Sequence, residues 1–134
     1  MKKILLSALM VLLTYSFALA DPVVIFSNNV SDSLDTDTVQ KIYLGKKSKW
    51  EDGSKIVPVA LEQGSVHDAF LEKFIKKNSS QFETYWKQMI FSGKGAPPKA
   101  FATEAELFDF ISKTPGAVGY VDSATSHEGV KEFK

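Results

Sequence analysis

The 134-residue sequence contains no cysteine and no arginine, and its only histidines are His67 and His127. Without cysteine, the chain has no disulfide and no lipid-attachment residue of the bacterial lipoprotein type. Two histidines do not form a metal cluster, so we expect no metal site and no other cofactor. Without arginine, a site for an oxyanion lacks the bidentate guanidinium group. It would depend on backbone amides, hydroxyls and lysine charges.

The charges are balanced, with 16 lysines and 16 acidic residues. If a leader carrying Lys2 and Lys3 is removed, fourteen lysines face sixteen carboxylates and the net charge is about −2. A nucleic-acid-binding domain of this size normally carries a clear excess of positive charge. We therefore expect no nucleic-acid partner.

The N-terminus has the pattern of a cleavable secretory signal. Lys2 and Lys3 precede an apolar block over residues 4–13, and Ala18-Leu19-Ala20 places small residues at the −3 and −1 positions. The apolar block is short for a membrane span. We predict a signal peptide over residues 1–20, cleavage after Ala20 and a periplasmic domain over residues 21–134. An uncleaved anchor and a Gram-positive exterior are the alternatives.

Strand and helix patterns alternate along residues 21–134. Apolar runs predict strands over residues 23–26, 56–61, 117–121 and 130–133. Helical spacing predicts a helix that ends near Gly45, and others that begin near residues 66, 80 and 103. This order predicts a single-lobe α/β domain of the periplasmic-binding-protein type, with a mixed, mostly parallel sheet flanked by helices.

Several further segments carry information about packing and chemistry. An aromatic stripe at helical spacing predicts a helix packed on the core, and Trp50 is expected to cover the edge of that core. Ser80-x-x-Glu83 and Thr103-x-x-Glu106 each have the spacing of a capping box. The Gly-Lys-Gly loop after residue 92 does not match a nucleotide-binding loop, so we do not expect nucleotide hydrolysis. The stripe comprises Phe82, Tyr85, Trp86, Met89 and Ile90.

The most informative stretch runs from Lys55 to Ile75. It combines an apolar strand, a polar turn from Glu62 to Ser65 and an amphipathic helix from Val66. The first N–H groups of such a helix have no intrahelical partner, and they suit an anion beyond the end of the strand. The spacing Ser65-x-x-Asp68 also fits a capping box, in which Ser65 would satisfy an amide of its own helix. The sequence leaves both interpretations open.

The same turn contains Ser65, His67 and Asp68, which are the residue types of a hydrolytic triad. Positions i, i+2 and i+3 of a helix do not all face one another, so we expect no catalysis. His67 is expected to be a solvated residue of the first turn. Alternatively, its imidazole would donate a proton to a bound anion at low pH.

Three segments occur in an order typical of one protein family. They are residues 39–46 followed by Trp50-x-Asp52-Gly53, then Gly64-Ser65 with Ala69-Phe70, and finally residues 114–121. In this order they resemble the phosphate-binding branch of periplasmic substrate-binding proteins. The likeness is greater to its short single-domain members, described as phosphate ABC transporter substrate-binding-like. The resemblance covers most of residues 21–134 and implies a type 2 periplasmic-binding fold.

The resemblance also implies a function. Full-length members of this family hold an oxyanion between two lobes, with hydroxyls and helix-start amides. Here the ligand would be phosphate or a similar small oxyanion, and the partner an ABC permease, a sensor or a second copy of the chain. No membrane insertion is expected after signal cleavage. The residues implied as ligand-binding are Gly64, Ser65, Val66 and His67, with Ser27 and Asn28 at the same carboxyl edge of the sheet.

Two departures from the family pattern predict weak binding. The arginine expected upstream of the Gly-Ser turn is absent, because the sequence there is Ala60-Leu61-Glu62-Gln63. The 114 residues after the predicted cleavage site also correspond to about one lobe, so half of the usual cleft is missing. The alternative function is a one-lobe relic that serves as a periplasmic adaptor or partner-binding domain without a small ligand.

Overall fold

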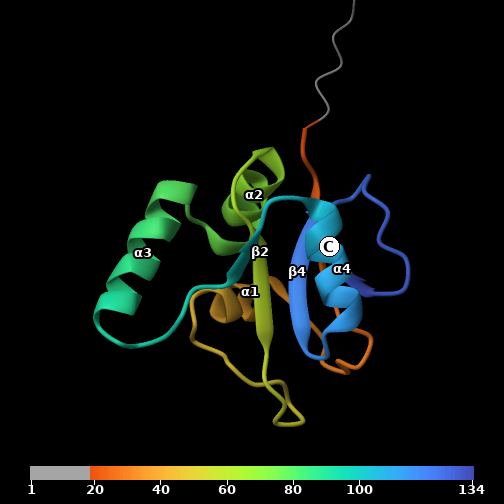
Figure 1. Cartoon of the computed structure of the whole chain (residues 1–134), viewed down its shortest axis with the longest axis horizontal. Coiled ribbons are helices and arrows are strands. Elements are labelled where there is room, and N and C mark those ends of the chain that lie inside the picture. Colours follow the sequence, from red (N-terminus) through yellow and green to blue (C-terminus); the bar gives the residue numbers. More distant parts are fainter. Residues whose placement is uncertain (1–18) are drawn as a thin grey trace, which may run out of the picture.

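The computed structural model describes residues 19–134, so residues 1–18 of the predicted signal peptide lie outside the described residues. The described chain forms one sheet with helices on its faces (Figure 1). The elements are β1 Pro22–Phe26, α1 Thr36–Tyr43, β2 Val57–Leu61, α2 Ser65–Phe70, η1 Leu71–Ile75, α3 Ser79–Phe91, β3 Lys99–Phe101, α4 Glu104–Lys113, β4 Ala117–Asp122 and β5 Lys131–Phe133.

The five strands lie in the order β3-β2-β4-β1-β5. β2 runs parallel to β3 and β4, whereas β1 runs antiparallel to β4 and β5. The predicted mixed α/β sheet is confirmed. The direction of β1 and the short edge strand β3 were not predicted, because a continuous apolar run does not encode which way a strand points.

Helices cover both faces of the sheet. On β4, Gly119 faces α4, where an added Cβ would lie 2.6 Å from Ile111 Cδ1 and 2.9 Å from Leu107 Cδ2. Tyr120 points to the other face, where its ring stacks on Phe70 at 3.8 Å between centroids. Neighbouring strand residues face opposite sides, so α4 covers one face while α1, α2 and η1 cover the other (Figure 1).

α3 lies beside the sheet at the left of Figure 1 and contacts the body through its aromatic stripe. Trp86 donates from Nε1 to the Tyr43 carbonyl at 3.1 Å, and the Tyr85 hydroxyl donates to the Leu44 carbonyl. Phe82 and Trp86 are buried, as predicted, whereas Ile90 remains 53% exposed. The stripe is therefore core only over its first two turns.

Helix caps agree with the sequence at one helix and differ at another. Thr103 accepts from the Glu106 amide at 3.2 Å, so the predicted cap of α4 is confirmed. The predicted box at Ser80 is wrong. Asn78 is the N-cap of α3, and its side chain accepts from the Gln81 amide at 2.8 Å, while Gln81 Oε1 accepts from the Asn78 amide at 2.9 Å.

Trp50 belongs to the core, as predicted. Its side chain is 3% exposed, and Nε1 donates to the Gly116 carbonyl at 3.0 Å. Gly116 has a φ of +79°, and an added Cβ would meet the Lys55 carbonyl oxygen at 2.5 Å. This contact fixes the loop before β2 against the turn before β4.

Among residues 19–134, the helices are too short or too polar to cross a membrane. The same residues contain no group of three or more potential metal-ligating side chains.

Candidate functional site

The turn between β2 and α2 brings the chain out of the core at the carboxyl end of β2. Leu61 is buried, and the next four residues, 62–65, are exposed. Gly64 is the N-cap of α2, with φ 111° and ψ 175°, a conformation that favours glycine. α2 then begins at Ser65 and continues through η1 as one helical stretch.

The N–H groups at the start of α2 are free of internal partners. No side chain caps this helix, so the Ser65-x-x-Asp68 capping box is wrong. The Asp68 amide donates to the Gly64 carbonyl at 3.0 Å, which closes the first helical turn. Within the described residues, no acceptor is bonded to the amides of Ser65 and Val66. These two donors are available to an anion.

A shallow hollow of about 240 Å³ lies at this helix start. Two of its lining residues, Glu104 and Asp122, carry carboxylates, and no lysine lines it. Glu104 accepts from the Asp122 amide and, at 3.2 Å, from the Thr125 hydroxyl. Asp122 accepts from the Asp21 amide at 2.8 Å. Local donors thus hold both carboxylates, but the side chains around the hollow are not electropositive. The remaining lining residues are Leu19, Ala20, Ser65, Val66 and Thr125.

Ser27 and Asn28 do not belong to this site, contrary to the prediction. β1 runs antiparallel to β4, so the end of β1 lies where β4 begins, and Phe26 pairs with Val118. The carboxyl end of β2 is at the opposite edge of the sheet, because β2 and β4 are parallel. The Ser27 amide donates to the Ala117 carbonyl at 3.0 Å, and Asn28 Nδ2 donates to the Gly129 carbonyl. Both residues join the loop after β1 to distant parts of the chain, namely the start of β4 and the turn before β5.

His67 is buried, which corrects the expectation of a solvated side chain. It is 6% exposed, and its Nδ1 shares a hydrogen bond with the Tyr120 hydroxyl. That hydroxyl also accepts from the Leu61 amide at 2.9 Å. The network assigns the Tyr120 proton to the bond with Nδ1, which leaves a neutral imidazole protonated on Nε2.

Burial sets the protonation of this pair. Removal from water lowers the pKa of His67, and the nearby carboxylates of Asp68 and Glu83 oppose this shift only in part. Burial also raises the pKa of the Tyr120 hydroxyl. The imidazole is therefore held neutral and inside the fold. His67 contributes its backbone, not its side chain, to the helix start.

The triad residue types do not assemble. Ser65 and Asp68 are exposed, whereas the imidazole of His67 points into the core and is bonded to Tyr120. A triad requires its histidine to bond both a nucleophile and a carboxylate.

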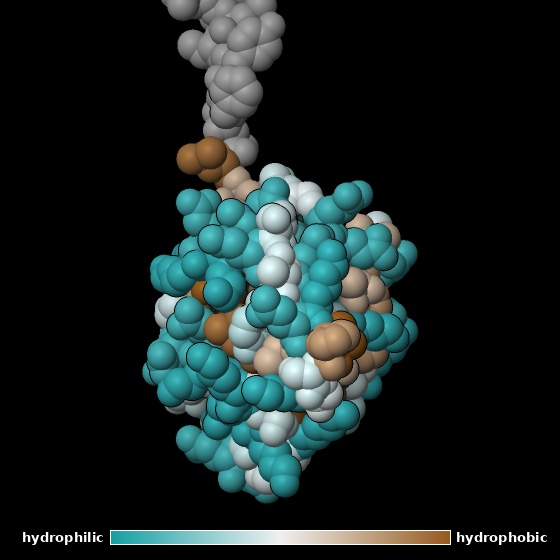
Figure 2. Space-filling view, turned by 90° about the vertical axis from the view of Figure 1, so that its left-hand side faces the viewer, coloured by the Kyte–Doolittle hydropathy of each residue, from teal (hydrophilic) through white to brown (hydrophobic). Residues whose placement is uncertain are grey.

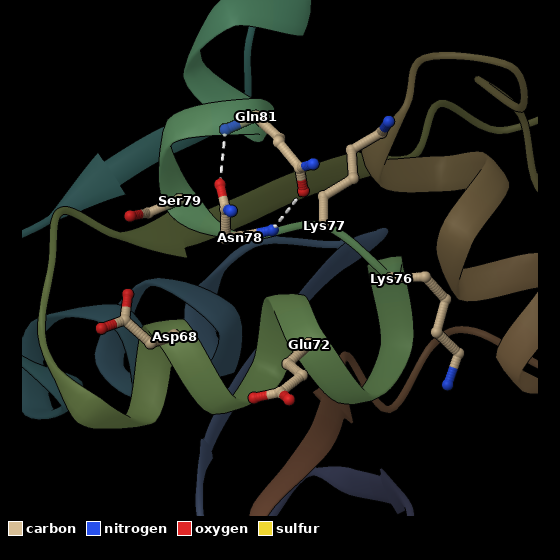
Figure 3. Close-up of a pocket in the computed structure, with 7 residues that line it drawn as sticks. All are labelled: Asp68, Glu72, Lys76, Lys77, Asn78, Ser79 and Gln81. Atoms are coloured by element: carbon tan, nitrogen blue, oxygen red, sulfur yellow. Dashed lines mark hydrogen bonds between the residues drawn. The ribbon is translucent and has the colours of Figure 1, made fainter.

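A polar cavity of about 510 Å³ lies between α2 with η1 and the start of α3. In Figure 3, Asp68 points from α2 toward the first turn of α3, while Lys76 and Lys77 point away from it. Asn78 and Gln81 form the capping box of α3 here. The side chain that faces the hollow from α2 is a carboxylate, so this cavity does not suit an oxyanion.

No protein-family model and no curated protein matches the chain. Solved structures do. An ABC-type phosphate transport receptor from Vibrio cholerae superposes with a TM-score of 0.64 at 16% identity, over 88% of this chain and 48% of that one. The chain shares the fold of phosphate ABC transporter substrate-binding proteins.

Two further structures have this fold. A putative phosphate ABC transporter substrate-binding protein with bound phosphate from Clostridium perfringens gives a TM-score of 0.65 at 20% identity, over 86% of this chain and 44% of that one. PstS from Borrelia burgdorferi gives a TM-score of 0.64 at 12% identity, over 84% of this chain and 46% of that one. The chain thus spans less than half the length of these three substrate-binding proteins.

Proposed function

We propose that the chain is an exported solute-binding-like domain of the phosphate ABC transporter type. It binds phosphate or a similar small oxyanion weakly at the start of α2, and it catalyses no reaction. The observation that supports this function is the uncapped helix start, with the Ser65 and Val66 amides free and the Ser65 side chain exposed at the carboxyl end of β2. The shared fold supports the ligand class.

The donors present set the strength of this site. An exposed helix start contributes about 0.3–1 kcal/mol to an anion contact, and up to about 2 kcal/mol when it is partly buried. A millimolar dissociation constant already requires about 4 kcal/mol. The amides of Ser65 and Val66 with one hydroxyl therefore give millimolar affinity at best. Tighter binding requires a second surface that contacts the anion, supplied by a second copy of the chain, a permease or a sensor.

Signal cleavage improves the site. Leu19 and Ala20 line the hollow beside Ser65, and cleavage after Ala20 removes both residues. The Asp21 nitrogen, 2.8 Å from Asp122 Oδ1, then becomes an ammonium group. The resulting ion pair neutralises one of the two carboxylates that line the hollow. The periplasmic form is thus more open and less acidic at Ser65 than the precursor.

Two substitutions at one position separate the hydroxyl from the amide. Ser65→Ala removes only the hydroxyl, whereas Ser65→Pro also removes the N–H. Proline is tolerated here because Ser65 is the first residue of α2 and the preceding Gly64 is extended in ψ. We expect the phosphate affinity of residues 21–134 to fall about twofold in Ser65→Ala and by a larger factor in Ser65→Pro. Equal affinity in all three proteins would refute binding at this helix start.

A partner-binding domain without a small ligand is the second candidate. At the end of α3, Phe91 is 95% exposed and Ile90 is 53% exposed. Figure 2 looks onto the α3 side of the molecule, where a few small hydrophobic groups interrupt a largely hydrophilic surface. Under this candidate, sedimentation with periplasmic extract shows a complex that Phe91→Ser abolishes, and phosphate has no effect. A monomer that recovers no protein would contradict it.

A further inference from the structure

A second cavity, of about 520 Å³, lies at the edge of the sheet opposite the α2 helix start. It sits at the amino end of β2, where Val57 and Pro58 line it, and beside Lys99 at the start of β3. The loop that follows α3 closes one side. One length of β2 therefore separates this cavity from Ser65, about 16 Å for a five-residue strand.

Four lysines line this cavity, and none of its lining residues is acidic. Lys47 and Lys55 lie in the connection between α1 and β2, Lys94 lies in the loop after α3, and Lys99 is the first residue of β3. Within residues 19–134, none of the four forms a salt bridge with a carboxylate. The Lys99 ammonium lies over the rings of Phe101 and Phe110, at 5.4 and 5.1 Å from their centroids, so the unpaired positive charge at this cavity comes from Lys47, Lys55 and Lys94. The lysines are Lys47, Lys55, Lys94 and Lys99.

The walls between the lysines are apolar and well ordered by packing. Trp86 is 5% exposed, and its ring edge lies close to Gly45, where an added Cβ would be 3.0 Å from Cη2. Ile56, Val57 and Pro97 complete these walls. The amides of Gly95 and Ala96 have no hydrogen-bond partner among the described residues. The cavity therefore combines a fixed floor with charged and neutral donors at its rim.

We propose that this cavity binds a small polyanion that carries at least two phosphate groups. Its volume falls within the range of about 300–1,000 Å³ that is typical of small-molecule sites. Lysine binds phosphate as a point charge, so the three lysines Lys47, Lys55 and Lys94 around one mouth favour several linked anionic groups over a single one. The site is independent of the oxyanion site at α2, which lies at the other edge of the sheet.

Tripolyphosphate is the probe for this proposal. In ¹⁵N NMR spectra of residues 21–134 at low salt, it should shift the Gly95 and Ala96 amides and the Trp86 indole N–H at micromolar to low millimolar concentration. Orthophosphate should require at least tenfold more to produce the same shifts. Affinity should fall as NaCl rises, because several exposed charges are screened. No shift at these three groups with 10 mM tripolyphosphate would overturn the proposal.

A pair of double variants tests the lysines. Lys47→Gln with Lys94→Gln removes two charges from the cavity rim, whereas Lys87→Gln with Lys134→Gln removes two charges from lysines outside its lining. One unit charge at about 4 Å contributes roughly fivefold in water, so we expect at least a tenfold loss in the first variant and less than twofold in the second. An equal loss in both would mean that net charge alone binds the probe, which refutes a site.

Two further outcomes would show that the phosphate groups bind elsewhere or belong to another kind of molecule. If vesicles containing anionic lipid shift the same resonances while tripolyphosphate does not, the occupant is a membrane surface and the small-molecule proposal is wrong. Tripolyphosphate shifts confined to Gly64–Val66 would also refute it and would instead support the α2 site. Failure at the lysine cavity leaves the Ser65 experiment unaffected, because the two sites report through different amides.

Discussion

Tyr120 connects the residues that matter most for the local chemistry. Its hydroxyl accepts from the Leu61 amide and bonds His67 Nδ1, and its ring stacks on Phe70. The end of β2 and the start of α2 are therefore held by one side chain of β4. The start of α2 is exposed to solvent, but its orientation is set from inside the core.

The two buried tyrosines provide a matched test of this role. Tyr43→Phe loses one donor, which its hydroxyl shares between the Val59 carbonyl at 2.7 Å and the Val118 carbonyl at 3.3 Å. Tyr120→Phe leaves two buried groups without partners, the Leu61 N–H and His67 Nδ1. A buried unsatisfied group costs about 1–3 kcal/mol, against about 1 kcal/mol for an ordinary hydrogen bond. In urea unfolding we expect Tyr120→Phe to lose more stability than Tyr43→Phe. The reverse order would contradict the network.

The two histidines give stability opposite dependences on pH. Burial lowers the pKa of His67 in the folded state, so the unfolded chain takes up the proton first as pH falls below about 6.5. Stability should therefore decrease from pH 7 to pH 5.5, by at most about 1.4 kcal/mol per pH unit. His67→Gln should remove this decrease.

His127 is the control for that experiment. The Thr125 carbonyl and the Glu132 carboxylate raise its pKa, so its contribution is present below about pH 6.5 and is lost as pH rises through the higher folded-state pKa. His127→Gln removes this stabilising contribution at low pH. The stability of that variant should therefore fall more steeply than that of the wild type as pH decreases, because the effect of His67 is no longer opposed. If His67→Gln and wild type have the same slope, the imidazole is not held neutral.

At the scale of elements, α3 depends on one cap and on a short aromatic contact. Asn78 and Gln81 satisfy each other's amides at its first turn, and Trp86 fixes its middle. Asn78→Ala should cost about 1 kcal/mol, whereas Ser80→Ala, at the position that the sequence predicted as the cap, should cost only a few tenths. Thermal unfolding of the two variants measures the difference. Equal losses would contradict the observed cap.

Local signals in the sequence predicted the elements well, and long-range ones poorly. Periodicity, the Thr103 cap and Gly45 located the helices, although the caps expected at Ser65 and Ser80 were wrong. The apolar runs located β1, β2 and β4. The sequence did not reveal that β1 runs antiparallel, because strand direction depends on pairing with residues about a hundred positions away. Because the direction of β1 was not known, Ser27 and Asn28 were predicted at the wrong end of the sheet. Burial of His67 was missed for the same reason, since its partner Tyr120 lies on a distant strand.

At the scale of the whole molecule, the N-terminal residues and β4 meet at the proposed site. The Asp21 nitrogen lies 2.8 Å from Asp122 Oδ1, beside the hollow that Ser65 lines. Nothing in the sequence predicted that Glu104 and Asp122 line this hollow, because both are brought there by the register of β4 and the start of α4. The sequence identified the strand, turn and helix start, but not the charges around them.

Signal cleavage should therefore change how much the interaction between the Asp21 nitrogen and Asp122 contributes to stability. In a chain that begins at Asp21, Asp122→Asn removes an ion pair with the terminal ammonium. In a chain that begins at Leu19, it removes only a hydrogen bond to an amide. We expect the loss of stability to be larger in the first chain by about 0.5–1 kcal/mol at low salt, and the difference to vanish in about 1 M NaCl. Equal losses at low salt would show that the ammonium does not pair with Asp122.

The most direct test of the central claim is a phosphate titration of residues 21–134, followed through the backbone amides by ¹⁵N NMR at low salt. We predict that the Gly64, Ser65 and Val66 resonances move progressively up to about 10 mM phosphate, while the Ser27 and Asn28 resonances at the opposite edge stay in place. If the three α2 amides do not move at 10 mM, the helix start binds no oxyanion and the solute-binding function is wrong.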